Sequence, residues 1–378
     1  MRRLQITPRP DWERKVAEQG FLFYKFDSYY AETTAYEFTA QEIDKIEIAT
    51  GEIFDMCLKA VEDVIINKRW DEFHIPRQYA EIIINSWYSD ACSFYGRLDL
   101  AITKDGGIKL LEFNADTPTS LLEASVIQWY WLQEYNSSAD QFNSIHEQLI
   151  NHMKICQPYF NQGKLFFSCI KSSIEDLMTT KYLQDVADQA GIRTDFVNIE
   201  DVGVEESLGQ FCTAQGEYIP NMFKLYPYEW MFNEKFGKYL LNCDTMWIEP
   251  FYKSILSNKM LLVLLYKMFP DSPYILPAKY SSDLNMQYPG KHVIKPVYSR
   301  EGNNVIIKDG NNIIEQTKGE YGYEGYIYQE FADIVEFDGM RPVIGSWLIG
   351  GNPAGMGIRE NASLITNNTS KFIPHFFM

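Results

Sequence analysis

The sequence lacks the patterns that mark several common classes of protein. Its six cysteines contain no CxxC pair and its five histidines show no zinc-finger spacing, which argues against a structural zinc centre. No Gly-x-x-x-x-Gly-Lys-Ser/Thr loop occurs, so the chain is not a P-loop nucleotide-binding protein. Low-complexity tracts are absent, and 46% hydrophobic with 15% aromatic residues excludes an intrinsically disordered chain.

Long apolar runs and clusters of basic charge are also missing. The longest apolar run, residues 260–266, is too short to cross a bilayer, and the first residues contain no apolar signal core. A net charge of −17 argues against a general nucleic-acid binder, because phosphate contacts need clustered Lys and Arg. We therefore expect a cytoplasmic protein with neither a membrane nor a nucleic-acid partner.

The cysteines are widely spread, and several lie in apolar runs. In a reducing compartment such residues are expected to be buried free thiols. The six are Cys57, Cys92, Cys156, Cys169, Cys212 and Cys243.

What the chain contains instead is a hairpin pattern at residues 95–114. The alternating segments 95–100 and 108–114 are typical of β-strands, and the Asp-Gly-Gly sequence between them is typical of a tight turn. Because side chains alternate along a strand, one face of the pair is expected to carry several polar side chains. These are Arg97, Asp99, Glu112 and Asn114.

The length of the turn decides whether these side chains meet. With a two-residue turn, Asp99 lies opposite either Glu112 or Asn114, and the three share one patch, whereas a three-residue loop would break this alignment. Two carboxylates and an amide oxygen suit Mg²⁺, and without a cation or proton the carboxylates would repel each other. The alternative is a polar face open to water, as many antiparallel sheets have.

The residues after the hairpin read as the start of a helix. Pro118 suits a first helical position with Thr117 as its N-cap, and Ser120 with Glu123 also fits a capping box. A helix start next to the polar patch would favour anions there, although capping alone would explain the same residues.

Amphipathic and alternating patterns predict the remaining elements. A capping box opens a helix at about 40–67, and residues 164–199 read as a β-α-β unit with a parallel sheet. Further elements are a helix at 259–269, strands at 291–298, 305–307 and 326–331, and a hairpin at 342–359. With 378 residues the chain has room for two or three subdomains of mixed α+β and α/β class.

Two lysines and two acidic residues are candidate ligand contacts. Lys259 lies near a predicted helix start, where the dipole disfavours a cation unless it faces an anion. Lys295 precedes a Gly-containing loop suited to phosphates, although an ordinary hairpin with a surface lysine would look the same. Glu175 and Asp176 open the helix of the β-α-β unit, placed either to hold an amine or to complement the helix dipole.

Together these motifs resemble the synthetase domain of glutathionylspermidine synthetases. They are, in chain order, Arg97-x-Asp99, Glu112-x-Asn114-Ala115-Asp116, Ser257-Asn258-Lys259, Lys295-Pro296, Arg300-Glu301-Gly302, Gln329-Glu330-Phe331 and Gly357-Ile358-Arg359. The resemblance covers essentially the whole chain. The chain departs from the family in lacking the amidase domain of the bifunctional members, in having Ser120 where a cysteine is expected, and in having no clear aspartate for the polyamine at 370–374. The resemblance implies a permuted ATP-grasp fold, in which the metal carboxylates precede the lysines, with an additional α/β, pre-ATP-grasp-like domain.

We expect three regions in this arrangement. Residues 1–150 would form a helical region with the metal-site hairpin, 151–250 an α/β substrate-side domain, and 251–378 the nucleotide-binding subdomains.

The resemblance also implies roles for residues that bind Mg²⁺ and ATP. The matches to magnesium ligands are Asp99, Glu112 and Asn114. The matches to phosphate contacts are Lys259 and Lys295, with Arg97 and Arg359 beside the transferring phosphoryl group. Glu301 and Gly302 match a lid, and Gln329, Glu330, Phe331 and Ala332 match the strand along adenine and ribose.

Substrate contacts and activity follow from the same resemblance. Thr117 and Thr119 match positions that bind glutathione, and Glu175 and Asp176 match positions that hold substrate. The implied activity is ATP-dependent amide formation through an acyl phosphate, joining glutathione or a related peptide to a polyamine. The alternatives are the same chemistry on another peptide and amine, and a non-catalytic Mg-nucleotide-binding protein.

Overall fold

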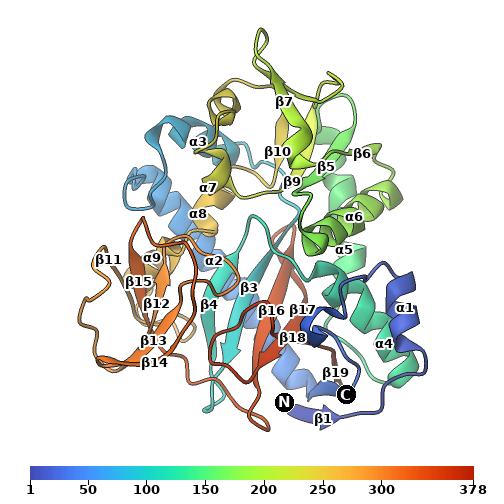
Figure 1. The fold of residues 1–378 in the computed structure, drawn as a ribbon, viewed down its shortest axis with the longest axis vertical. Coiled ribbons are helices and arrows are strands. Elements are labelled where there is room, and N and C mark those ends of the chain that lie inside the picture. Colours follow the sequence, from blue (N-terminus) through green and yellow to red (C-terminus); the bar gives the residue numbers. More distant parts are fainter.

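The structure is a computed structural model that describes residues 1–378 and contains five sheets. Figure 1 shows the three larger ones as a central teal and red sheet, an orange sheet beside it, and a green to yellow sheet above. The structure combines helices with sheets, which confirms the predicted mixed α+β class. None of the helices combines enough length with enough apolarity to span a bilayer.

The central sheet joins two hairpins that are far apart in the sequence. Its order is β18-β17-β16-β3-β4, and every neighbouring pair is antiparallel. The strands are β3 (Tyr95–Ile102), β4 (Ile108–Asn114), β16 (Arg341–Ile349), β17 (Asn352–Asn361) and β18 (Lys371–Ile373). Both predicted hairpins are confirmed, and their pairing through β3 and β16 places them in one sheet.

The connection between β3 and β4 differs from the predicted turn. Three residues, 104–106, separate Thr103 from Gly107, whose carbonyl accepts the Thr103 N–H at 2.8 Å. The register then shifts by one residue at a bulge, so that Leu100 faces Leu110 but Asp99 faces Glu112. The prediction that a three-residue loop would break the alignment was wrong, because the extra residue in β4 compensates for the extra residue in the loop.

A second five-stranded sheet forms the wall opposite the central hairpin. Its order is β11-β15-β12-β13-β14, and α9 (Met260–Met268) packs beside it. The strands are β11 (Ala278–Ser281), β12 (Lys291–Pro296), β13 (Ile306–Asp309), β14 (Asn312–Gln316) and β15 (Tyr326–Glu330). The predicted helix at 259–269 and strands in this part of the chain are confirmed.

The third large sheet is parallel and has the order β10-β9-β5-β6. Its elements are β5 (Leu165–Cys169), α6 (Ile174–Gln189), β6 (Thr194–Phe196), β9 (Asn221–Leu225) and β10 (Met246–Ile248), with a small β7 (Val202–Glu205) and β8 (Gln210–Thr213) ribbon. This confirms the predicted β-α-β unit. Lys224 in β9 forms a fully buried ion pair with Asp116, which links this sheet to the end of the central hairpin.

The remaining elements enclose these sheets. The long helix α2 (Ala40–Ile66) has the predicted capping box between Thr39 and Glu42. The other helices are α1 (Trp12–Glu18), α3 (Ala80–Tyr88), α4 (Gln128–Tyr135), α5 (Ile145–Cys156), α7 (Tyr228–Met231) and α8 (Lys253–Leu256). Strands β1 (Arg2–Gln5), β2 (Thr34–Phe38) and β19 (His375–Phe377) bring the two termini together (Figure 1).

Two sequence predictions were wrong in detail. The helix after the hairpin begins at residue 121, so the predicted start at Pro118 was wrong and the start after Ser120 is the one observed. Ser120 has a φ of +68°, and its hydroxyl pairs with the Tyr29 hydroxyl instead of capping the first turn. Cys92 and Cys156 form a disulfide, whereas the other four cysteines are free as predicted. The three domain boundaries remain predictions.

Candidate active site

A polar site lies where the central sheet faces the β12 sheet. Two cavities meet there, one of about 750 Å³ and one of about 1110 Å³. Both are lined by Asp99, Glu112, Arg300, Glu301, Gly302 and Thr366. We call the smaller one the apolar cavity and the larger one the acidic cavity, because their other lining residues are mainly apolar in the first and include further acidic residues in the second.

The predicted metal ligands come together at the junction of the two cavities. Asp99 faces Glu112 across the β3–β4 pair, as the first of the two predicted alignments required. The Asn114 amide nitrogen donates to Asp99 at 3.1 Å and to Glu112 at 3.4 Å. Arg97 binds Asp99 with two nitrogens, at 2.6 and 3.1 Å.

Nearby basic side chains favour the charged form of both carboxylates. Burial alone would raise the pKa of Glu112, but Lys259 and Lys295 outweigh it and lower that pKa to about 2. The Lys259 Nζ atom lies 3.2 Å from a Glu112 oxygen. Burial raises the pKa of Asp99 from its ordinary value, and the bound Arg97 guanidinium opposes that shift.

The two lysines reach the junction from separate elements. Lys259 directly precedes α9, at whose start the Asn258 side chain accepts the N–H of Met260. The Lys259 Nζ atom donates to the Ser299 carbonyl at 2.8 Å. Lys295 extends from β12 and donates to the Leu111 carbonyl and to Gln329, both at 2.9 Å. Leu111 is the extra residue of the β4 bulge, so the bulge also presents the carbonyl that holds Lys295.

The apolar cavity is lined by hydrophobic residues for about half of its wall, which would suit a base. Phe331 and Ala332 line it, as predicted for the adenine strand. Of the other residues predicted on that strand, Gln329 is buried and holds Lys295, and Glu330 is exposed outside the cavity. Sequence reasoning missed further apolar lining residues, which are Val293, Val305, Ile307, Ile334, Leu364 and Ile365.

A loop between β12 and β13 borders both cavities. Glu301 and Gly302 have φ angles of +54° and +68°, and a Cβ on Gly302 would lie 2.5 Å from the Thr366 carbonyl, so only glycine fits. Arg300, which precedes them, pairs with Glu229 at 2.9 Å and donates to the Thr117 hydroxyl. The predicted lid residues therefore lie over the carboxylates.

The acidic cavity contains all the predicted substrate and phosphoryl contacts. These are Arg97, Thr117, Thr119, Glu175, Asp176 and Arg359. Arg359 in β17 is held by the carbonyls of Asn367 and Ser370, each at 2.9 Å. Burial, reinforced by Glu175, raises the pKa of Asp176 to about 6.

Glu123 is a buried acid near this cavity that sequence reasoning assigned only to a capping box. It lies in a π-helical turn, Glu123–Ile127, and accepts a hydrogen bond of 2.8 Å from Tyr29. Burial and then the charge of Glu175 raise its pKa to about 7. An acidic side chain within a predicted apolar helix was the one signal that could have revealed it.

The residues at the junction fit a magnesium nucleotide. Three side chains with oxygen donors converge beside two lysines and an apolar slot, which is the donor chemistry that Mg²⁺ and a triphosphate need. Coordination by Asn114 would require its amide to turn over, because its nitrogen now points at both carboxylates. Asp99, Glu112 and Asn114 would hold the metal, and Lys259 and Lys295 the phosphates.

A solved structure shares this overall fold. A glutathione synthetase-like effector from Globodera pallida, in its apo form, aligns with a TM-score of 0.59 over 99% of this chain and 98% of its own, at 9% sequence identity. The fold is therefore of the glutathione synthetase-like class.

Sequence comparison then identifies the family. The family described as "Glutathionylspermidine synthase preATP-grasp" matches residues 3–378, and the chain belongs to it. This confirms the resemblance inferred from the motifs. The relatives named below are ligases, and the chain is an ATP-dependent ligase of the C–N bond-forming class.

Three curated relatives differ in how much of their length the chain covers. A Haemophilus influenzae protein, provisionally named an acid–amine ligase, is 38% identical over 399 residues that span all of both chains. Trypanothione synthetase of Crithidia fasciculata is 27% identical over 86% of this chain and 54% of its own. The bifunctional glutathionylspermidine synthetase/amidase of Escherichia coli is 23% identical over 90% and 58%. The chain spans little more than half of the last two.

The pKa of Lys295 predicts how nucleotide binding depends on pH. Burial lowers this pKa to about 8, so the lysine is charged below that pH and loses its charge above it. We expect the affinity for Mg-ATP, measured by titration calorimetry, to fall about tenfold between pH 7 and pH 9.5. The Lys295→Arg variant stays charged and should show a flatter profile; an equal fall in both proteins would contradict a phosphate contact at Lys295.

Proposed function

We propose that the chain is an ATP-dependent carboxylate–amine ligase that joins a thiol peptide such as glutathione to a polyamine or another amine. The proposal rests on one observation, namely that two carboxylates, Asp99 and Glu112, lie between an apolar cavity and an acidic one. A base fits the first cavity and a cationic amine fits the second, so the reacting groups would meet at the carboxylates.

The nucleotide end of the site supports phosphoryl transfer. When bound, Mg-ATP supplies the phosphoryl group that activates the peptide carboxylate as an acyl phosphate, which the amine then attacks. Arg97 and Arg359 border the acidic cavity from β3 and β17, where they would neutralise charge on the transferred group. Positioning and charge neutralisation suffice for this chemistry, and no protein nucleophile is required.

The order of the site residues supports a permuted ATP-grasp fold. The carboxylates come from the hairpin at 95–114, whereas both lysines and the lid follow much later, from 259 onwards. The last strands of the chain, β16 to β18, then return to the same sheet as the hairpin. On this proposal the parallel sheet is the additional pre-ATP-grasp-like domain.

The acidic cavity supports an amine substrate beside a peptide. Glu175 and Asp176 project from the first turn of α6, and the cavity lining includes Thr117 and Thr119 across from them. Two relatives, trypanothione synthetase and glutathionylspermidine synthetase/amidase, have names that point to the same pair of substrates. The identity of the peptide and amine, and a cytoplasmic location, remain predictions.

Removing either central carboxylate should abolish ligation. We expect Asp99→Asn and Glu112→Gln to lower kcat at least about a hundredfold, because each removes an anionic ligand of the metal that would neutralise the phosphates. Amine-dependent phosphate release is the readout, and circular dichroism checks the fold. Asp333→Asn, at an exposed aspartate, is the matched control and should keep full activity. Retained turnover in both site variants would refute their role.

Removing the acids of α6 should weaken the amine rather than the nucleotide. We expect Glu175→Gln and Asp176→Asn to raise the KM for the amine about tenfold each, while the KM for ATP stays unchanged. The exposed Asp185 on the same helix provides the control variant Asp185→Asn. A panel of thiol peptides and polyamines in the same assay separates this substrate pair from another one. Nucleotide binding without phosphate release, whichever amine is added, would favour the non-catalytic alternative.

A further inference from the structure

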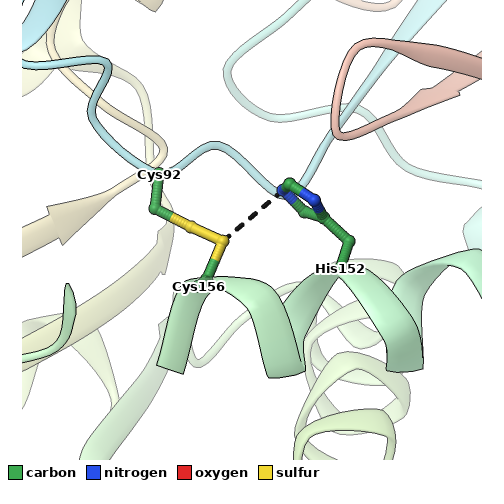
Figure 2. A group of neighbouring side chains, drawn as sticks. All are labelled: Cys92, His152 and Cys156. Atoms are coloured by element: carbon green, nitrogen blue, oxygen red, sulfur yellow. Dashed lines mark hydrogen bonds between the residues drawn. A yellow bond between two sulfur atoms is a disulfide. The ribbon is translucent and has the colours of Figure 1, made fainter. Parts of the chain in front are cut away.

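The disulfide between Cys92 and Cys156 lies apart from the proposed active site. Cys92 belongs to the segment that connects α3 to β3, and Cys156 is the last residue of α5 (Figure 2). The two Cα atoms are 5.9 Å apart across a sequence separation of 64 residues. His152 lies one turn earlier on α5 and faces the same sulfur atoms (Figure 2).

The hydrogen bonds of His152 decide what its ring can do. Its Nε2 atom lies 2.8 Å from the carbonyl oxygen of Ser93 and 3.5 Å from the Cys156 sulfur. A carbonyl oxygen only accepts, so Nε2 carries the proton. That N–H therefore also lies beside Cys156, where it would stabilise a thiolate once the disulfide is reduced.

A metal centre is the competing interpretation of the same three residues. Their ligand atoms lie within 4.8 Å of one another, which is close enough for one cation. The proton shared with Ser93 occupies Nε2, however, which leaves only Nδ1 of the ring to bind a cation. The two sulfur atoms are also bonded to each other. The geometry therefore favours thiol–disulfide chemistry.

We propose that Cys92 and Cys156 are a reversible redox pair that a low-molecular-weight disulfide oxidises. Cys92 is partly exposed and Cys156 is 3% exposed, so a small disulfide reaches Cys92 first. The Cys92 thiolate attacks one sulfur of that disulfide, which releases one thiolate and leaves a mixed disulfide on Cys92. The Cys156 thiolate then attacks Cys92 Sγ and releases the second thiolate, so two electrons pass to the small disulfide.

The segment that holds Cys92 leads directly into the strand of the active site. Ser93 and the backbone N–H of Phe94 both donate to the buried carboxylate of Glu249, and β3 begins one residue later. Oxidation therefore ties α5 to the start of the strand that carries Arg97 and Asp99. This inference rests on the disulfide and its surroundings and does not depend on the substrates of the enzyme.

The test uses the full chain equilibrated in buffers of different glutathione to glutathione disulfide ratio. Free thiols are alkylated, peptides are mapped by mass spectrometry, and the melting temperature is measured in parallel. We expect one internal disulfide, Cys92–Cys156, and a melting temperature roughly 5 °C higher in the oxidised form, since closing a loop of this length restricts the unfolded chain. Cys92→Ser should abolish both changes, whereas Cys212→Ser, at a free cysteine, should preserve them.

A second variant tests the part played by His152. We expect His152→Gln to form the disulfide about tenfold more slowly, because Cys156 loses the donor beside its sulfur. Alkylation of both Cys92 and Cys156 at every ratio would overturn the proposal. Stoichiometric Zn²⁺ binding by the reduced chain, lost in Cys92→Ser, would also overturn it and favour a metal site.

Discussion

Two adjacent, partly buried carboxylates that need basic partners are the feature on which the rest of the site depends. Two like charges about 4 Å apart repel by roughly 4 kcal/mol at the effective dielectric near a protein surface, so Asp99 and Glu112 cannot both remain ionised without partners. The partners come from three places: Arg97 from the same strand, Lys259 from the start of α9, and Lys295 from β12. The site therefore exists only where the two antiparallel sheets are held side by side (Figure 1).

This balance of charge also explains how the site could accept its ligands. Lys259 now pairs with Glu112, which a divalent cation would neutralise in its place. Once released from the carboxylate, the lysine would face the phosphates that arrive with the metal. Lys295 donates hydrogen bonds to Gln329 and to the carbonyl of Leu111 at the bulge. Of the two lysines, Lys295 is therefore the one whose position is fixed before the phosphates bind.

Much of the site could be predicted from the sequence, because alternation along two strands determines which side chains share a face. What the sequence could not predict is the compensation between the three-residue loop and the bulge at Leu111, since a bulge has no strong local signal and is stabilised here by Lys295. Of the two predicted helix starts, the one after Ser120 is observed, but Ser120 adopts a positive φ that its residue type does not predict. Glu123 was missed because its role depends on burial against Tyr29 and Glu175.

A crystal structure with Mg²⁺ and a non-hydrolysable ATP analogue tests the central claim most directly. We expect a magnesium ion about 2.1 Å from oxygen atoms of Asp99 and Glu112, with the Asn114 amide turned to present its oxygen. The base would lie against Phe331, and Lys259 would have moved from Glu112 to the phosphates. A nucleotide bound elsewhere, or a metal that contacts neither carboxylate, would contradict the account.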